Sequence, residues 1–143
     1  MFNNVLRNCK VHRSLAATAA GSTNVNGTTI DSEGATSIVH KLGVGTLTAT
    51  QVTSLQAQSG DASDGSDMAD ITGASVTFAD ADSGKVALVE VFKPTKRYHR
   101  LQAKRATANA VLDFGLTELY FNRTGPDTQN GTLIAGSAIK QAT

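Results

Sequence analysis

The residues best suited to a chemical role are the basic side chains in the second half of the chain. Seven lysines and arginines lie between residues 85 and 105, against a single glutamate. Residues 61–82 carry six aspartates and no basic residue, so the net charge changes from −6 to +6, although the whole chain sums to +1. Ammonium and guanidinium groups bind carboxylates and phosphates. This charge reversal predicts a surface that binds a partner, copies of the chain itself included.

The candidate contact surface is the segment KPTKRYHRLQAKR at residues 93–105. From Tyr98 the residues alternate, so that Arg100 and Lys104 face one side of a strand while Leu101 and Ala103 face the other. We interpret the basic side as a protein-contact surface. Its candidate residues are Lys93, Lys96, Arg97, Tyr98, Arg100, Lys104 and Arg105.

Two other interpretations of this basic segment stay open. Basic side chains with Tyr98 and His99 on a strand could follow phosphates and stack bases. The near-neutral total charge argues against nucleic acid, because six nearby aspartates would repel a polyanion. An ordinary solvated strand face is the other alternative. We favour contact with an acidic protein surface, because it is a less demanding explanation of the basic segment than binding of a polyanion.

The histidines do not predict a metal or catalytic site. His12, His40 and His99 lie on different predicted segments, without an HExxH motif or another metal-ligand spacing. We expect them on the surface or on edge strands. The glycine-containing stretch GVGTLT at residues 43–48 lacks the GK[ST] of a phosphate-binding loop. The sequence predicts no catalytic residue and no cofactor.

The aspartate cluster suggests calcium at first sight, because carboxylates recur at every third residue from Asp61 to Asp70. Aligning Gly65 with the glycine of an EF-hand loop puts Gly60 at the first ligand position and Ile71 at the closing glutamate. That loop is therefore excluded. We expect a solvated acidic hairpin turning at Asp64 and Gly65, with an irregular calcium site as the alternative.

Composition indicates how these residues must be positioned. A chain of 143 residues forms one domain with its own core, and seven aromatic residues without tryptophan make that core modest. Short alternating segments separated by Gly, Asp, Asn and Ser predict an all-β protein. Cys9, the only cysteine, excludes an internal disulfide, and we expect it to be a small buried thiol.

The predicted organisation has three parts. Residues 1–35 form an extended N-terminal arm with one strand near residues 24–30, residues 36–122 form a β-sandwich, and residues 123–143 form a C-terminal tail. Residues 85–92 (KVALVEVF) predict a strand buried on both faces or at the centre of a sheet. Residues 111–121 predict a strand with a bulge at Gly115 or Thr117, and a helix is the competing prediction.

Neither targeting nor membrane insertion is indicated. The first 21 residues have early basic residues and an alanine-rich end, but Asn8, Lys10 and Arg13 interrupt the apolar core that a signal peptide needs. No apolar run approaches the roughly 18 residues of a membrane helix. We therefore expect a soluble protein with no membrane partner.

Several short motifs together resemble a family of structural proteins encoded near the head genes of tailed bacteriophages. The motifs are VGTLT at residues 44–48, DASDGS at 61–66, DI at 70–71, the apolar strand at 86–92, and KRYHR at 96–100 followed by Thr107. They cover residues 28–110. This chain is similar to the head decoration, or cement, proteins.

The resemblance implies a jelly-roll-like antiparallel β-sandwich on the outer surface of the virion head. It implies a protein made in the host cytoplasm that bridges neighbouring major capsid proteins and associates with itself as a dimer or trimer. A tail or baseplate component with a similar sandwich is the alternative function. A nucleic-acid-binding β-domain is the less favoured one.

Overall fold

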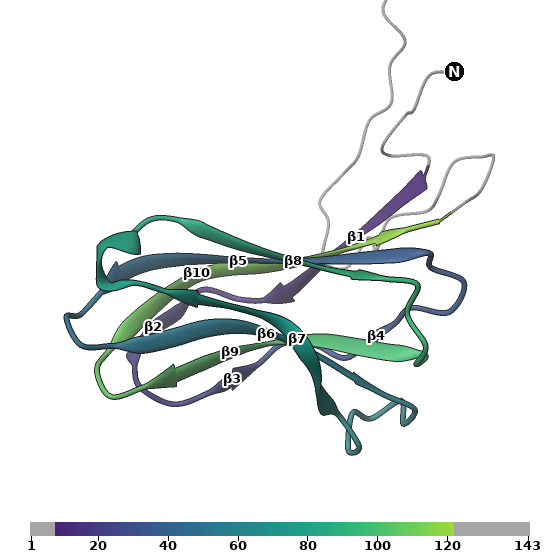
Figure 1. Ribbon diagram of the computed structural model, residues 1–143, viewed down its shortest axis with the longest axis horizontal. Coiled ribbons are helices and arrows are strands. Elements are labelled where there is room, and N and C mark those ends of the chain that lie inside the picture. The colour runs from purple at the N-terminus through teal and green to yellow at the C-terminus, as the bar shows by residue number, and fades with distance from the viewer. Residues whose placement is uncertain (1–7, 122–143) are drawn as a thin grey trace, which may run out of the picture.

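The computed structural model describes residues 8–121, which form two antiparallel β-sheets packed face to face (Figure 1). The strands are β1 (Cys9–Leu15), β2 (Thr18–Gly21), β3 (Val25–Asn26), β4 (Ile30–Asp31), β5 (Ser37–Leu47), β6 (Val52–Gly60), β7 (Ala69–Phe78), β8 (Val86–Phe92), β9 (Tyr98–Ala106) and β10 (Ala110–Tyr120), with a short 3₁₀ turn at Asp80–Asp82. No helix among the described residues is long and apolar enough to cross a membrane.

The strand order is that of a jelly roll. One sheet, called sheet A, has the order β1-β10-β5-β8, with β2 also paired to β10. The other, sheet B, has the order β3-β9-β6-β7, with β4 also paired to β9. Strands consecutive in the chain therefore mostly cross between the sheets, as in the double-sheet Greek-key arrangement. The prediction of an all-β sandwich is confirmed.

The core lies between the two sheets and is built from alternate residues of each strand. On β9, for example, Leu101 and Ala103 are fully buried, while Arg100 and Lys104 between and beside them point outward, as the alternation predicts. The other large side chains of the core are mostly leucines of β5, β6 and β10. Small residues such as Ala57 fill the remaining space.

β10 is a strand over its whole length, so the competing helix prediction is wrong. The pairing with β5 shifts earlier than expected, between Ala110 and Leu112 and again between Leu112 and Phe114. The pairing with β1 shifts where Leu116 and Gly115 face Arg13 and Leu15, so an irregularity lies at the predicted glycine, on the partner strand. A Cβ at Gly115 would lie 2.6 Å from the Cβ of Leu15, so glycine also allows the two strands to approach closely.

The N-terminal arm predicted for residues 1–35 is wrong for residues 9–31. These residues form β1 and β2 on sheet A and β3 and β4 on sheet B. β1 starts beside the end of β10, where the Phe121 N–H donates to the Asn8 carbonyl at 2.9 Å. The predicted C-terminal tail, residues 123–143, lies outside the described residues.

The strand at residues 86–92 is an edge strand, so its prediction as a central or doubly buried strand is also wrong. Among the strands that the structure describes, β8 pairs only with β5. Ala87 and Val89 are buried, whereas Leu88 and Phe92 are 58% and 67% exposed. Glu90, in line with the exposed pair, was the available signal, because a doubly buried strand rarely keeps an unpaired carboxylate.

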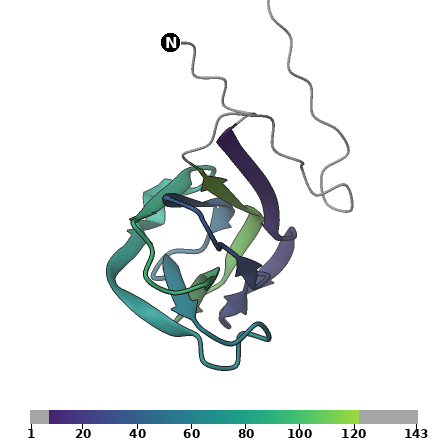
Figure 2. The ribbon, with the colours of Figure 1, turned by 90° about the vertical axis from the view of Figure 1, so that its right-hand side faces the viewer.

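The acidic segment forms the loop between β6 and β7, which projects from the body of the sandwich (Figure 2). Gly65 lies at φ +72°, in the left-handed region that a tight turn requires. The Asp67 carboxylate accepts hydrogen bonds from the N–H groups of Asp61 and Ala62 at 2.8 and 3.0 Å. These bonds lower the pKa of Asp67 and close the loop on itself.

Candidate protein-contact surfaces

The basic segment lies on the outer face of sheet B. We call this surface the polar face; it comprises Asn26, Asp31, Gln58, Asp70, Tyr98, Arg100, Gln102 and Lys104, with Lys96 and Arg97 from the loop before β9. β9 is an interior strand of the sheet, so its outward side chains have neighbours on both sides. The predicted residues Lys96, Arg97, Tyr98, Arg100 and Lys104 are therefore brought together here.

Most of the charges on the polar face are paired within the chain. Arg97 binds the Asp31 carboxylate through Nη2 at 2.8 Å and through Nε at 3.1 Å, and it binds Glu33 at 3.0 Å. Lys104 forms an ion pair with Asp70. The hydrogen bond from Arg97 lowers the pKa of Asp31, and the one from Lys104 lowers the pKa of Asp70.

The uncharged groups of the polar face are also bonded to their neighbours. Arg100 Nε donates to Gln58 Oε1 at 2.7 Å, and the Gln58 amide donates to Asp70 at 2.7 Å. At the other side of β9, the Gln102 amide donates to Asn26 Oδ1 at 2.7 Å. The side chains therefore form a connected row across β3, β9, β6 and β7, which holds them in fixed positions.

In the fold, the acidic and the basic segments of the sequence lie close enough to form ion pairs with each other. The acidic β6–β7 loop and the basic β9 segment lie in one sheet, and Lys96 forms an ion pair with Asp61 as Lys104 does with Asp70. Opposite charges far apart in sequence therefore pair across the sheet and its loops. Four carboxylates, of Asp31, Glu33, Asp61 and Asp70, pair with three of the four basic side chains of the polar face, so this face is not a basic ladder.

Arg105 does not belong to this surface. Its side chain is 5% exposed and points between the sheets. The guanidinium donates to the carbonyl of Thr23 at 2.8 Å, of Ala19 at 3.0 Å and of Ala110 at 2.8 Å. Arg105 therefore ties the β2–β3 connection to β9 and β10. Its selection as a contact residue is wrong, because the sequence alternation had already placed position 105 on the inward side.

A second candidate surface lies on the outer face of sheet A. We call it the apolar face; it comprises Val39, Val86, Leu88, Phe92, Phe114 and Leu116. The pairing of β10, β5 and β8 places these side chains on one side of the sheet. Gly43 lies between Val86 and Phe114, and a Cβ there would lie 2.3 Å from the Phe114 ring, so the ring rests on the glycine.

Charged groups accompany the apolar face, among them Glu90, which lies between Leu88 and Phe92 on β8. Lys41 and Glu118 form an ion pair at 2.8 Å across β5 and β10. Lys93, the remaining predicted contact residue, lies with Nζ 5.4 Å from the centre of the Phe92 ring, at cation–π distance. Val86, Leu88 and Phe92 are the exposed apolar side chains of this face, and exposed apolar groups gathered on one surface mark contact sites on soluble proteins. Sequence reasoning missed this face because it placed β8 inside a sheet.

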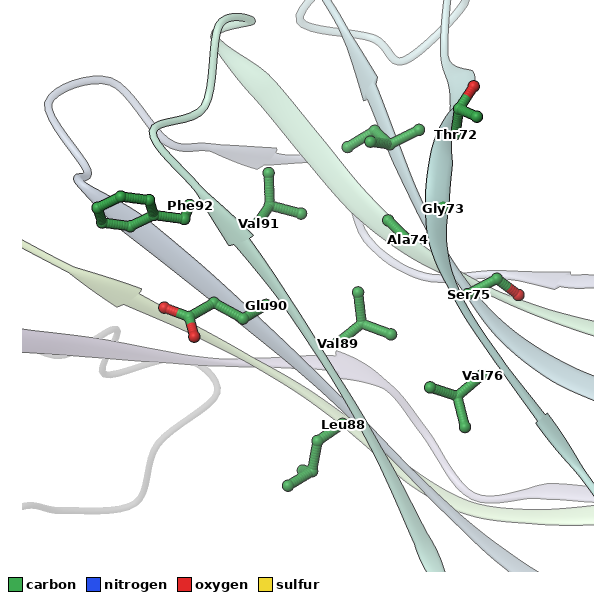
Figure 3. A pocket seen from close by; sticks show the side chains of 11 residues that line it. Thr72, Gly73, Ala74, Ser75, Val76, Leu88, Val89, Glu90, Val91 and Phe92 are labelled. Atoms are coloured by element: carbon green, nitrogen blue, oxygen red, sulfur yellow. The ribbon is translucent and has the colours of Figure 1, made fainter.

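A groove of about 440 Å³ runs between β8 and β7, where the edges of the two sheets meet. Figure 3 shows Val89 and Val91 pointing from β8 toward β7, while Leu88, Glu90 and Phe92 point to the opposite side. The β7 wall consists of residues 71–76, among them Ala74 and Val76. The groove is therefore the open seam of the sandwich.

Two of the histidines are core residues, which corrects their predicted surface or edge positions. His40 and His99 are 0% and 1% exposed. His40 Nδ1 lies 2.8 Å from Thr117 Oγ1, and His99 Nδ1 lies 2.7 Å from Ser32 Oγ. Burial lowers the pKa of His40 to about 3 and that of His99 to about 4. Both rings are neutral and structural.

Within residues 8–121, no three His, Cys, Asp or Glu side chains lie close enough together to hold a metal ion. The aspartates of the β6–β7 loop instead accept backbone hydrogen bonds or face lysines. No protein-family model matches the sequence, and no curated protein matches it.

Proposed function

We propose that this protein is a structural component of a tailed-bacteriophage head, which decorates the outer surface of the capsid and bridges neighbouring major capsid proteins. The observation that carries the proposal is the contrast between its two outer faces. Leu88 and Phe92 are more than half exposed on the apolar face, while the charges of the polar face are paired internally. Such a molecule docks by one face and meets water with the other.

Docking through the apolar face follows from the free energy of burying apolar surface. Each square ångström of apolar area removed from water stabilises a complex by about 25 cal/mol before the costs of association. Because Val86, Leu88 and Phe92 already have fixed positions on a sheet, little conformational entropy is lost when they are covered. A modest contact of this kind repeated over many capsid positions reinforces the shell by multivalency.

Sequence and fold give additional support. The motifs around residues 44–48, 61–66 and 96–107 resemble those of head decoration proteins. Jelly rolls recur in viral capsid components, although a shared fold supports a function only by analogy. Arg97 of the KRYHR motif pairs with Asp31 and Glu33 within the chain.

The test uses purified capsids, with and without this protein. Capsids that carry it should rupture at a higher temperature, because rupture must also expose the surface that it buries. Equal rupture temperatures would sink the proposal. Electron micrographs of the particles would also separate a position on the head from one on the tail.

Two variants identify the docking face. Leu116→Lys changes the apolar face at β10, away from the β8 edge, and we expect it to abolish capsid binding. The combined reversal of Arg97, Arg100 and Lys104 to Glu changes the polar face, and we expect a folded protein that still binds. The opposite pattern would return the contact to the basic segment, as the sequence alone had suggested.

A further inference from the structure

Within residues 8–121, one row of backbone hydrogen-bonding groups of β8 has no strand partner. At its two ends, Lys93 N–H donates to Thr36 O and Val44 N–H donates to Lys85 O, both at 3.0 Å. In an antiparallel pair the groups of alternate residues point toward the partner strand. The odd-numbered residues of β8 therefore bond to β5. The N–H and C=O groups of Val86, Leu88, Glu90 and Phe92 point away from the sheet.

This edge lacks two of the features that usually prevent strand pairing, a bulge and a proline, and Glu90 is the one charged side chain inside the strand. β8 keeps one uninterrupted register with β5 over seven residue pairs, without a bulge or proline inside the strand. The neighbouring edge strand β7 is protected: its pairing shifts between Gln56 and Gln58, and Gly73 lies at φ +80°. The Gln56 amide donates to Ile71 O at 3.1 Å and to Ala74 O at 3.3 Å, so it fills the irregular ladder.

We propose that β8 pairs with β8 of a second copy of this chain, in antiparallel orientation, about a two-fold axis at Val89. Sheet A then continues across both copies. In this register Val86 lies opposite Phe92 of the second copy, and Leu88 lies opposite Glu90 of the second copy. All four outward residues of each strand then exchange both of their backbone hydrogen bonds.

The sequence of the strand favours a second copy in this register. Rotation about Val89 matches the two ends of β8, sets an aromatic ring against Val86, and keeps the two Glu90 carboxylates apart. A two-fold axis at Leu88 would instead set Phe92 against Gly84. The Gly84 N–H already donates to Val44 O and Gly45 O, at 3.1 Å each. That register would therefore leave hydrogen bonds of Phe92 unmade.

The pairing also sets the apolar side chains of the edge beside those of the second copy and leaves the outer face of the continued sheet open. Val86, Leu88 and Phe92 are 47%, 58% and 67% exposed, and the groove of about 440 Å³ opens along the same strand. A stable interface buries roughly 1,200–2,000 Å² in total. For the dimer to be stable, the two paired strands and their apolar side chains must bury an area of this order.

The first measurement is the mass of the full chain by sedimentation equilibrium. We expect a dimer at about 100 μM, because interfaces of this size bind in the micromolar range or tighter. A monomer at that concentration would overturn the proposal.

Charge substitutions at Leu88 test the register. Leu88→Glu sets the introduced carboxylate opposite Glu90 of the second copy, so we expect dimerisation at least about 30-fold weaker. Within its own sheet the new carboxylate faces Lys41, so the monomer keeps its fold. Leu88→Lys instead meets Glu90 of the second copy and should dimerise at least as well as the wild type. Equal weakening by both changes would overturn the register.

Val52→Glu is the matched control. Val52 is 52% exposed at the start of β6, away from the β8 edge, and its replacement should leave dimerisation unchanged. A dimer that Leu88→Glu weakens no more than Val52→Glu would overturn the β8 interface. If Leu88→Glu did not fold, Phe92→Glu at the 67% exposed end of the edge would carry the same expectation.

Amide hydrogen exchange gives an independent measurement. In the wild type, the N–H groups of Val86, Leu88, Glu90 and Phe92 should exchange about tenfold more slowly, or slower still, than in Leu88→Glu. The N–H group of Val89 bonds to β5 and should be protected in both. Fast exchange at the even positions of the wild type would exclude strand pairing. These experiments use the isolated protein, so they can fail or succeed independently of the proposed capsid role.

Discussion

β9 and β8 are both regular strands with alternating faces, but the outward side chains of β9 have partners within the chain, whereas those of β8 are exposed. β9 is an interior strand, and its outward Arg100 and Lys104 find partners in Gln58 on the neighbouring β6 and Asp70 on β7 beyond it. On β8, Leu88 and Phe92 lie at an edge and remain exposed. The difference shows that a run of like charge in a sequence does not by itself make a charged surface. The position of a strand in its sheet decides which side chains are left for a partner.

Acid should have the largest effect on both strands, because it destabilises the core that supports the two faces. An unfolded chain binds protons at histidines below a pKa of 6.5, whereas His40 and His99 in the fold bind them only near pH 3 and pH 4. Between these values the unfolded state binds more protons, so stability is lost as the pH falls from about 6.5 toward 4. We expect a loss of roughly 4 kcal/mol between pH 7 and pH 4.5.

Urea unfolding at a series of pH values measures this loss. Aspartates on the polar face, such as Asp31, have lowered pKa values and contribute at a more acidic pH, so the window above pH 4 belongs to the histidines. The variant His99→Asn should show a shallower pH dependence than the wild type. Equal unfolding free energies at pH 7 and pH 4.5 would contradict the buried, neutral state of these rings.

The next largest effect is expected when the same change, arginine to methionine, is made on each side of β9. Arg105→Met should lower the free energy of unfolding by about 3 kcal/mol, because three buried carbonyls lose their donor. Arg100→Met, an outward position on the same strand, should cost less than about 1 kcal/mol. Thermal and urea unfolding of both variants would measure the two losses, and similar costs would show that the inward and outward arginines are equivalent.

The smallest effect concerns a single ion pair on the polar face. A double-mutant cycle with Lys104→Ala and Asp70→Ala should give a coupling energy below about 1 kcal/mol, since both side chains are more than one third exposed. The coupling should fall further in 1 M salt, where the screening length is about 3 Å. A coupling that salt leaves unchanged would show that the pair is shielded from water, unlike the rest of this face.

The sequence was sufficient for local features and insufficient for long-range ones. Alternation alone places Leu101 inward and Arg100 outward, and the Asp64-Gly65 pair gives the turn. What it lacks is the identity of the neighbouring strand. Arg97 meets Asp31, 66 residues earlier, because β4 pairs with β9, and no local pattern carries that information.

The position of β8 illustrates the same difficulty. Its apolar run is compatible with the middle of a sheet and with an edge that binds a partner, because both bury Val89 and its inward neighbours. Glu90 separates the two cases only if its solvent exposure is known. The proposed contact face could therefore be recognised only once the strand order was available.

The first and last described residues lie next to each other, so the strands of this fold could be connected in a different order. Phe121 donates its N–H to the Asn8 carbonyl at 2.9 Å, so the ends of β1 and β10 are neighbours. A short linker could join them, and the chain could be opened instead in the exposed β6–β7 loop. Such a circular permutant would retain every strand pair of both sheets. The order in which the strands are synthesised is then separable from the packing that defines the two faces.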